Sequence, residues 1–225
     1  MNDEHPDEIR VLLVDDQELF RAGIQVILDA QPGIRVVGTA SDGAEAVSAV
    51  RALSPDVVLM DMRMPEMDGV EATRQIFSPA AVAARETPVK VIVLTTFNLD
   101  DRAATAIRLG ASGFLLKGTS PALLVDAVRT VHAGHAVLAP EDLATLMEGQ
   151  FNTPEVTVPA AYASLTERER EVFDGVVRGL SNGEIAAASF LGESTVKTHV
   201  GSVLRKLGLR DRVQIVVFAY EHGLA

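Results

Sequence analysis

The sequence predicts an α/β protein: a five-stranded, doubly wound parallel sheet followed by a second, smaller all-α domain of four helices. Short apolar runs alternate with amphipathic helical patterns over residues 9–133, which is typical of a parallel sheet covered by helices on both faces. Residues 164–225 carry helix signals only. Charge divides in the same way, because residues 164–225 hold eight basic and eight acidic side chains, so residues 1–163 carry the whole net charge of −11.

Composition narrows the class of protein. The chain has 225 residues, of which 48% are hydrophobic and 23% charged, as in globular proteins. It has no cysteine, which excludes disulfides and thiolate sites. No apolar stretch approaches the roughly 18 residues of a membrane span, and the acidic start lacks the apolar core of a signal peptide. We therefore expect a cytoplasmic protein without a membrane partner. Overall acidity argues against nonspecific nucleic-acid binding by the whole chain, but not against a local contact surface.

Five apolar runs are the predicted strands. They are Ile9–Val14, Ile34–Gly38, Asp56–Met60, Lys90–Leu94 and Gly113–Leu116. Amphipathic stretches lie between them; in the first, Phe20, Ile24 and Leu28 recur at helical spacing. The connection Ser78–Pro88 is longer than a tight helix-to-strand turn needs, and we expect an extended helix end or a surface loop there.

A linker is predicted at residues 134–163, between a first domain of residues 1–133 and a second domain of residues 164–225. The run from Pro140 predicts a short helix through Glu148, whereas Gly149–Ala163 has no periodicity.

The second domain contains four predicted helices. Thr166-x-x-Glu169 and Ser181-x-x-Glu184 are capping-box patterns, which start helices towards Gly179 and Ser189. A third helix ends before Gly208. Its apolar face is formed by Val196, Val200, Val203, Leu204 and Leu207, and its opposite face by Lys197, Thr198, Gly201, Ser202 and Arg205. A fourth helix runs from about Arg212 to His222. Its residues Val213, Val216 and Val217 belong either to the core or to a dimer contact.

Polar side chains stand at the carboxyl ends of four predicted strands. Asp15 and Asp16 follow the first strand, Asp61 the third, Thr95 the fourth and Lys117 the fifth. Open parallel sheets place their sites at this edge, so we expect one acidic pocket that binds a hard divalent cation, most simply Mg²⁺. A free carboxylate oxygen of Asp61 would be the nucleophile, and the hydroxyl and ammonium groups would stabilise a phosphoryl group on it.

These residues lie in motifs that resemble the receiver domain of two-component signalling, which has a flavodoxin-like fold. The motifs are Leu13-Val-Asp-Asp, Asp61-Met-Arg-Met-Pro-Glu-Met-Asp-Gly69, Leu94-Thr-Thr-Phe97 and Gly110-Ala-Ser-Gly-Phe-Leu-Leu-Lys117. The resemblance implies that Asp61 is the phosphoacceptor and that Asp15, Asp16, Asp61 and the backbone carbonyl of Arg63 bind Mg²⁺. It also implies that Thr95 and Lys117 contact the phosphoryl oxygens and that Phe114 is the switch residue. Phe114 lacks a hydroxyl, so any switching there is a change of packing. Gly118 replaces the usual Pro or Asp, and a cis Lys117–Gly118 peptide is suggested by the resemblance alone.

The second domain resembles the LuxR-type helix-turn-helix. The motifs are Leu165-Thr-Glu-Arg-Glu-Arg-Glu-Val172, Gly179-Leu-Ser-Asn-Gly-Glu-Ile-Ala186 and Thr195-Val-Lys-Thr-His-Val200. The whole chain thus resembles a NarL/LuxR-family response regulator. The resemblance implies that the helix from about Glu193 enters the major groove and that the helix from about Asn182 crosses the DNA backbone. The DNA-facing residues would be Lys197, Thr198 and Ser202, with Arg205 and Lys206 nearer the phosphates and His199 either half-buried or in a single phosphate contact. Gly192 replaces the usual Ser cap, and Gly201 stands where relatives often have a reading side chain.

The resemblance implies a transcription factor that a cognate histidine kinase phosphorylates, with an operator in double-stranded DNA, a phosphorylation-dependent homodimer and RNA polymerase as a further candidate partner. It would not be an enzyme, apart from accepting and slowly losing its own aspartyl phosphate. The alternative of a Mg²⁺-dependent phosphatase or phosphotransferase lacks a second carboxylate at position 63. The other alternative is a regulator controlled by a ligand or by its expression level. Its signature would be the loss of Asp15, Asp16 or Lys117, and all three are present.

Overall fold

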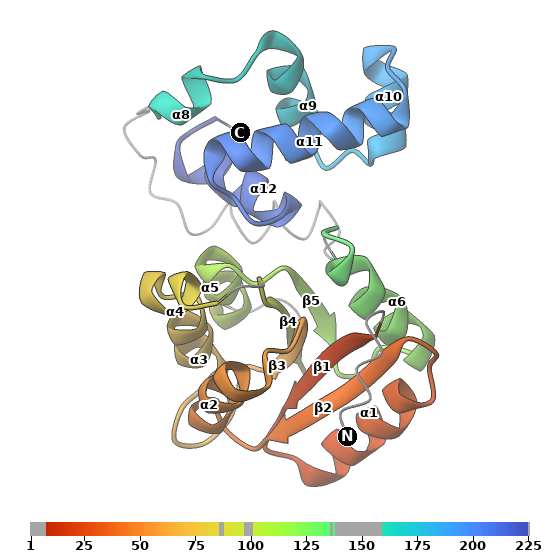
Figure 1. Ribbon diagram of the computed structural model, residues 1–225, viewed down its shortest axis with the longest axis vertical. Coiled ribbons are helices and arrows are strands. Elements are labelled where there is room, and N and C mark those ends of the chain that lie inside the picture. The colour runs from red at the N-terminus through yellow and green to blue at the C-terminus, as the bar shows by residue number, and fades with distance from the viewer. Residues whose placement is uncertain (1–7, 86–87, 97–100, 136, 138–158, 225) are drawn as a thin grey trace. The chain divides into compact units, whose positions relative to one another are not determined.

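The computed structural model describes residues 8–85, 88–96, 101–135, 137 and 159–224 (Figure 1). The chain divides into two compact units, Met1–Val137 and Leu138–Ala225. Each unit is a folded body with its own core, and the two are described separately.

The first unit contains a five-stranded parallel sheet in the order β2-β1-β3-β4-β5. The strands are β1 (Ile9–Val14), β2 (Ile34–Ala40), β3 (Val57–Asp61), β4 (Lys90–Thr95) and β5 (Gly113–Leu116). The strand order reverses beside β1, and open parallel sheets place their sites at the carboxyl ends of the strands at such a switch point.

Helices cover both faces of this sheet (Figure 1). Helices α1 (Glu18–Asp29) and α6 (Pro121–His132) lie on one face. The other face is covered by α2 (Gly43–Leu53), α3 (Gly69–Ile76) and α5 (Asp101–Leu109), and the short helix α4 (Pro79–Ala83) follows α3. The fold class predicted from the sequence is therefore confirmed.

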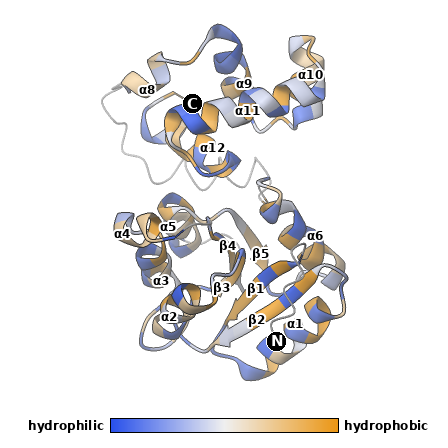
Figure 2. Ribbon diagram, in the orientation of Figure 1, coloured by the Kyte–Doolittle hydropathy of each residue, from blue (hydrophilic) through white to orange (hydrophobic). Residues whose placement is uncertain are grey.

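The core follows from the alternation of side chains along buried strands. Val11, Leu13 and Leu59 lie in one buried cluster with Leu28 of α1 and Val128 of α6. Figure 2 shows hydrophobic residues along the central strands, whereas the surrounding helices carry both colours. In the buried parts of β1, β3 and β4 the side chains are apolar up to Asp15, Asp61 and Thr95 at the carboxyl ends.

Strand boundaries differ from the prediction by one or two residues. Strand β3 is shifted by one residue, because Asp61 pairs with Leu94 and stays in the ladder. Strand β2 continues to Ala40 because Ala40 pairs with Val14, and β4 includes Thr95, which pairs with Leu116. Hydrogen-bond pairing with a neighbouring strand determines where these strands end. The apolar pattern of a single strand does not reveal that pairing.

Both ends of the predicted linker belong to the folded units. Val137 bridges to Gly113 of β5, and its carbonyl accepts a hydrogen bond of 3.0 Å from Phe114 N–H. At the other end, residues Ala160–Ala163 form the helical turn α8, and the ring of Tyr162 packs edge-on against Phe173 at a centroid distance of 5.1 Å. The helix predicted from Pro140 to Glu148 lies outside the described residues.

The second unit contains the four helices expected from the sequence, with α8 before them. They are α9 (Glu167–Val177), α10 (Asn182–Ser189), α11 (Glu193–Leu207) and α12 (Arg212–Glu221). Complete capping boxes begin α9 and α10. Gly192 is the N-cap of α11 without a side-chain hydrogen bond, and the helix forms as expected. The residues Val213, Val216 and Val217 are buried within this chain, so they belong to the core rather than to an exposed dimer contact.

Gly69 tests how tightly the loop after β3 is packed. A Cβ atom at this position would lie 2.1 Å from the backbone oxygen of Asp61, whereas a Cβ at Gly23, in the middle of α1, would meet no atom within 4 Å. We therefore expect Gly69→Ala to lower the free energy of unfolding of the first unit by about 1–3 kcal/mol. The control Gly23→Ala should raise it by about 0.5–1 kcal/mol, because glycine weakens a helix interior.

Urea unfolding of the full-length chain, followed by far-ultraviolet circular dichroism, measures both effects. The chain has two tyrosines and no tryptophan, and Tyr162 and Tyr220 both lie in the second unit, so the tyrosine-fluorescence transition should not move. Equal stability of the two variants would contradict the close approach at Gly69.

Candidate functional site

The first part of the site is the turn between β1 and α1. Asp15 follows the last residue of β1 and is 2% exposed, whereas its neighbour Asp16 is exposed. The backbone N–H of Gln17 donates a 2.9 Å hydrogen bond to Asp15 Oδ1. The guanidinium of Arg21 donates to the backbone carbonyl of Asp15. The turn is thereby fixed at its start and at the first turn of α1.

Asp61 is the last residue of β3 and is 4% exposed. Its Oδ1 atom accepts a 3.1 Å hydrogen bond from the backbone N–H of Arg63, the residue whose carbonyl is the predicted fourth metal ligand. Glu66 adopts the left-handed conformation with φ of 59° in the loop that follows. The same loop is tied to α2, because Gly43 N–H donates a 2.9 Å hydrogen bond to Met67 O.

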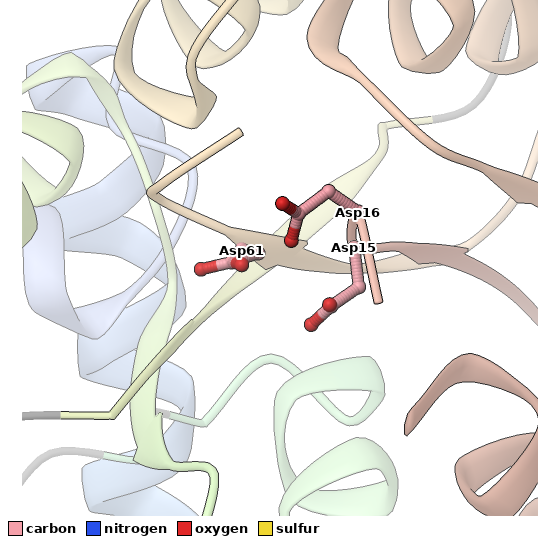
Figure 3. Close-up of side chains that lie close together, drawn as sticks. All are labelled: Asp15, Asp16 and Asp61. Atoms are coloured by element: carbon pink, nitrogen blue, oxygen red, sulfur yellow. The ribbon is translucent and has the colours of Figure 1, made fainter. Parts of the chain in front are cut away.

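Three carboxylates meet at this edge of the sheet. One oxygen each from Asp15, Asp16 and Asp61 lies within 4.8 Å of the other two (Figure 3). Three like charges at this separation repel one another, and hard carboxylate oxygens are the ligands that small divalent cations prefer. The cluster therefore has the donor set and spacing for a metal ion.

Lys117 brings one positive charge into the cluster. Its Nζ atom lies 2.6 Å from Asp15 Oδ2 and 2.8 Å from Asp61 Oδ2, and its side chain is 8% exposed. The backbone is held as well, because Lys117 N–H donates a 2.7 Å hydrogen bond to Thr95 O. The Lys117–Gly118 peptide is trans, which contradicts the cis bond suggested by the resemblance. No proline is present to lower the cost of a cis form.

These contacts change the proton affinities of both partners. Burial lowers the pKa of Lys117, but the hydrogen bonds and charges of Asp15 and Asp61 outweigh it, so the pKa is raised overall. Burial raises the pKa of Asp15, and the hydrogen bond and charge of Lys117 offset this only in part. Lys117 thus carries a full positive charge at neutral pH against the carboxylate of Asp61.

Thr95 and Phe114 stand on the two strands beyond β3. Thr95 ends β4 and is 3% exposed, and Phe114 is half-buried on β5. The edge therefore combines a carboxylate held by one hydrogen bond and one ion pair, a metal-binding cluster, an ammonium and a nearby hydroxyl. This is a chemistry suited to a nucleophilic carboxylate and to stabilisation of an oxyanion on it.

The second unit presents a polar face on α11. Lys197, Thr198 and Arg205 are exposed on it, together with Gly201. Ser202 is half-buried and accepts a hydrogen bond of 3.4 Å from Arg205 Nη2. His199 is also half-buried. All of the predicted DNA-facing residues, from Lys197 to Lys206, thus lie on α11.

Lys206 is engaged inside the unit. Its Nζ atom lies 2.6 Å from Glu169 Oε2 and donates a 3.1 Å hydrogen bond to Ser164 O. Glu169 is 6% exposed and is also the acidic member of the first capping box, with Thr166. The hydrogen bond from Lys206, followed by that from the Thr166 backbone, lowers the pKa of Glu169 to about 2. Lys206 therefore has a structural partner that the helical pattern of the sequence did not reveal.

The sequence analysis did not predict a second internal contact of a basic side chain. Arg212, at the start of α12, donates a 2.8 Å hydrogen bond from Nη1 to Asn182 Oδ1, and its Nη2 donates to the carbonyl of Leu180. Burial lowers the pKa of Arg212. The contact fixes the start of α10 against α12. No periodic pattern indicates a contact between residues 30 positions apart. The one available signal was the position of Arg212 directly after Asp211, the N-cap of α12.

Comparison with known proteins agrees with this geometry. The family model "Response regulator receiver domain" matches residues 11–129, and the model "Bacterial regulatory proteins, luxR family" matches residues 163–219. The response regulator protein VraR of Staphylococcus aureus is 41% identical over 217 residues, which cover 96% of this chain and 98% of that protein.

Two solved structures are similar as well. One is a LuxR-family two-component response regulator from Aurantimonas, with 32% identity and a TM-score of 0.55 over 64% of this chain and 98% of that chain. The other is the receiver domain of a NarL response regulator from Mycobacterium tuberculosis, with 36% identity and a TM-score of 0.51 over 58% of this chain and 100% of that chain. Among the described residues, no helix has the length and apolar character to cross a bilayer.

The acidic edge and the helical unit thus lie in the two segments that these family models match. The chain belongs to the LuxR family of two-component response regulators and combines a receiver domain with a LuxR-type DNA-binding domain.

Proposed function

We propose that this response regulator controls transcription through phosphorylation of Asp61 by a cognate histidine kinase. The observation that carries the proposal is the position of the Lys117 ammonium between Asp15 and Asp61 at the carboxyl edge of the sheet. Asp61 is buried, but it belongs to the same cluster as the exposed Asp16. A phosphodonor can therefore approach from the side of Asp16.

In the proposed reaction, a carboxylate oxygen of Asp61 attacks the phosphorus of a phosphohistidine. The new O–P bond forms as the P–N bond breaks, and the imidazole leaves as the neutral base after taking up a proton. Lys117 neutralises negative charge on the phosphoryl oxygens, and the hydroxyl of Thr95 donates to one of them. Through these contacts the phosphoryl group on Asp61 acts on Thr95 of β4 and on Lys117 after β5. The half-buried ring of Phe114 on β5 then changes its packing.

The acidic cluster fits Mg²⁺ as the cofactor of this reaction. The carboxylates of Asp15, Asp16 and Asp61 and the backbone carbonyl of Arg63 would hold it. When bound, Mg²⁺ supplies positive charge against the oxygens of the incoming phosphoryl group. The exposed position of Asp16 leaves that side of the cluster open.

Double-stranded operator DNA is the proposed partner of the second unit. In this proposal α11 enters the major groove with Lys197, Thr198, Ser202 and Arg205, His199 makes at most one phosphate contact, and α10 crosses the backbone. Lys206 is assigned to the ion pair with Glu169 rather than to a phosphate. Residues 164–225 have no net charge, so the attraction to DNA would come from the exposed basic side chains of α11 rather than from the unit as a whole.

Three further features complete the proposal. Phosphorylation favours a homodimer, RNA polymerase is a candidate partner at promoters, and the protein works in the cytoplasm. Catalysis is limited to gaining and slowly losing its own aspartyl phosphate. The match to a receiver domain and a LuxR-type domain supports the cytoplasmic location, because such a regulator must reach both a kinase and a promoter.

Replacement of the phosphoacceptor tests the chemistry. We expect Asp61→Asn to abolish labelling by a small phosphodonor, because the amide lacks the nucleophilic oxygen. The control Asp126→Asn, an exposed aspartate of α6, should label like the wild type. Removal of Mg²⁺ with a chelator should also stop labelling. Intact-mass spectrometry measures the phosphoryl adduct, and stoichiometric adduct on the Asn variant would place the acceptor elsewhere.

Replacement of exposed basic residues of α11 tests the DNA face. We expect Lys197→Ala and Arg205→Ala to weaken operator binding, and each lost phosphate contact should reduce the salt slope of log K by about 1. Arg168→Ala is the matched control, because this exposed arginine of α9 pairs with Glu171 at 2.6 Å. Fluorescence anisotropy at several salt concentrations gives both quantities. Unchanged affinity and slope for both α11 variants would show that this face does not meet DNA.

The Lys206–Glu169 pair predicts a stability effect with a defined pH dependence. Lys206→Met should lower the free energy of unfolding of the second unit by about 1–3 kcal/mol at neutral pH, because it leaves a nearly buried carboxylate without its cation. The folded-state pKa of Glu169 is about 2, below its ordinary value of 4.5. The stabilisation is therefore present above pH 4.5 and is lost as pH falls towards 2, so the difference between variant and wild type should shrink over this range.

Tyrosine fluorescence during urea unfolding follows the second unit selectively. The comparison variant Lys197→Met should unfold like the wild type and lose DNA affinity, while folded Lys206→Met should keep the wild-type salt slope. The reverse pattern would mean that Lys206 is the phosphate contact.

A further inference from the structure

The receiver domain has a second cavity at the amino ends of its strands. It has a volume of about 570 Å³ and is lined by residues at the end of α2, by α4 and Arg85, and by Val89 before β4. Its polar wall is formed by Arg51, Ser54 and Arg85, and its apolar wall includes Val50, Pro55 and Val89. Pro55 precedes β3 and Val89 precedes β4, whereas Asp61 ends β3. The cavity is therefore at the opposite edge of the sheet from the phosphorylation site.

The long connection after α3 builds one wall of this cavity. The sequence predicted an extended helix end or a surface loop at Ser78–Pro88, and the structure forms the short helix α4 there, capped by Ser78. Arg85 follows this helix and points its guanidinium to the cavity wall and to the end of α3, where it donates a hydrogen bond to the carbonyl of Ile76. The longer connection thus places Arg85 at the cavity wall, which a tight turn between α3 and β4 would not do.

Two positive charges line the cavity without a carboxylate among its described lining residues. Burial lowers the pKa of Arg85, and the charge of Arg51 lowers it further. The Nε–H group of Arg85 is buried and has no hydrogen-bond partner in the described part of the chain. A buried donor without an acceptor and two neighbouring cations both cost free energy, and one anion would relieve both.

Helix capping accounts for only part of this arrangement. Arg51 lies in the last turn of α2, and the Nη2 group of Arg85 caps α3, where positive charge is favourable. Capping explains neither the unpartnered Nε–H nor the shared cavity.

We propose that this cavity binds a small organic phosphate, with Arg51 and Arg85 holding the phosphoryl oxygens and the apolar wall holding the body of the molecule. Guanidinium groups match phosphoryl oxygens through paired hydrogen bonds. The volume is that of sites for small organic ligands rather than for a bare ion. The hydroxyl of Ser54 adds a neutral donor on the same wall. This site is separate from the acidic cluster and does not depend on phosphorylation of Asp61.

Phenylphosphonate is a suitable probe, because its P–C bond prevents phosphoryl transfer to Asp61. The full-length chain is titrated without Mg²⁺, so that the acidic cluster repels the anion. The arginine Nε–H signals in ¹H–¹⁵N spectra report binding directly. We expect the signals of Arg85 and Arg51 to move, and we expect tighter binding of phenylphosphonate than of inorganic phosphate.

Substitutions then assign the site. Arg51→Gln and Arg85→Gln should each lower the affinity about tenfold, the effect of losing one charge-assisted contact. Arg35→Gln, which removes an exposed arginine of β2, should leave it unchanged. Arg51 is exposed, so its variant should fold even if loss of the Ile76 contact destabilises Arg85→Gln.

Three results would overturn the proposal. One is an affinity that Arg51→Gln leaves unchanged. Another is equal affinity for phenylphosphonate and inorganic phosphate, which would show that the apolar wall plays no part. The third is a titration in which phenylphosphonate moves arginine Nε–H signals other than those of Arg51 and Arg85.

Discussion

The receiver domain depends on one constraint: three carboxylates share a small space and need compensating positive charge. Lys117 supplies part of it from inside the protein, through contacts of 2.6 Å and 2.8 Å to Asp15 and Asp61. The remaining negative charge gives the cluster the donor set for a metal ion. Gly69 lies next to this cluster, and the absence of a side chain there leaves room for the backbone carbonyl of Asp61.

The helical unit uses its charges differently. Two of its basic groups are committed to internal structure: Lys206 pairs with Glu169, and Arg212 holds Asn182. Both contacts join helices that are distant in sequence, and both involve at least one nearly buried or half-buried group. The cations of Lys197 and Arg205 stay exposed on α11 and take no part in the core. A unit with no net charge can thus keep a localised basic face while the rest of the chain stays acidic.

Parallel topology gives the sheet two chemically distinct edges. Every strand runs in the same direction, so the carboxyl ends gather the aspartates and Lys117, while the amino ends gather the ends of the preceding helices. Arg51 and Arg85 lie at the latter edge, separated from the acidic cluster by the length of the strands. Binding at the two edges can therefore be measured independently. The contrast follows from chain direction alone, although the cavity also needs the additional residues around α4.

The sequence by itself determined the fold class, the five strands to within two residues and the residues of the acidic cluster. It could do so because buried strands are continuous apolar runs and because the first polar residue after each run must lie at a common edge. Tertiary structure alone decided that Asp61 stays within the β3 ladder, that the linker begins and ends inside the folded units, and that the valines of α12 are core. It also decided that Lys206 turns to Glu169, that Arg212 turns to Asn182 and that Arg51 and Arg85 share one cavity. Periodicity reports which face of an element is buried, whereas partners separated by 30 or more residues are set by how the elements pack.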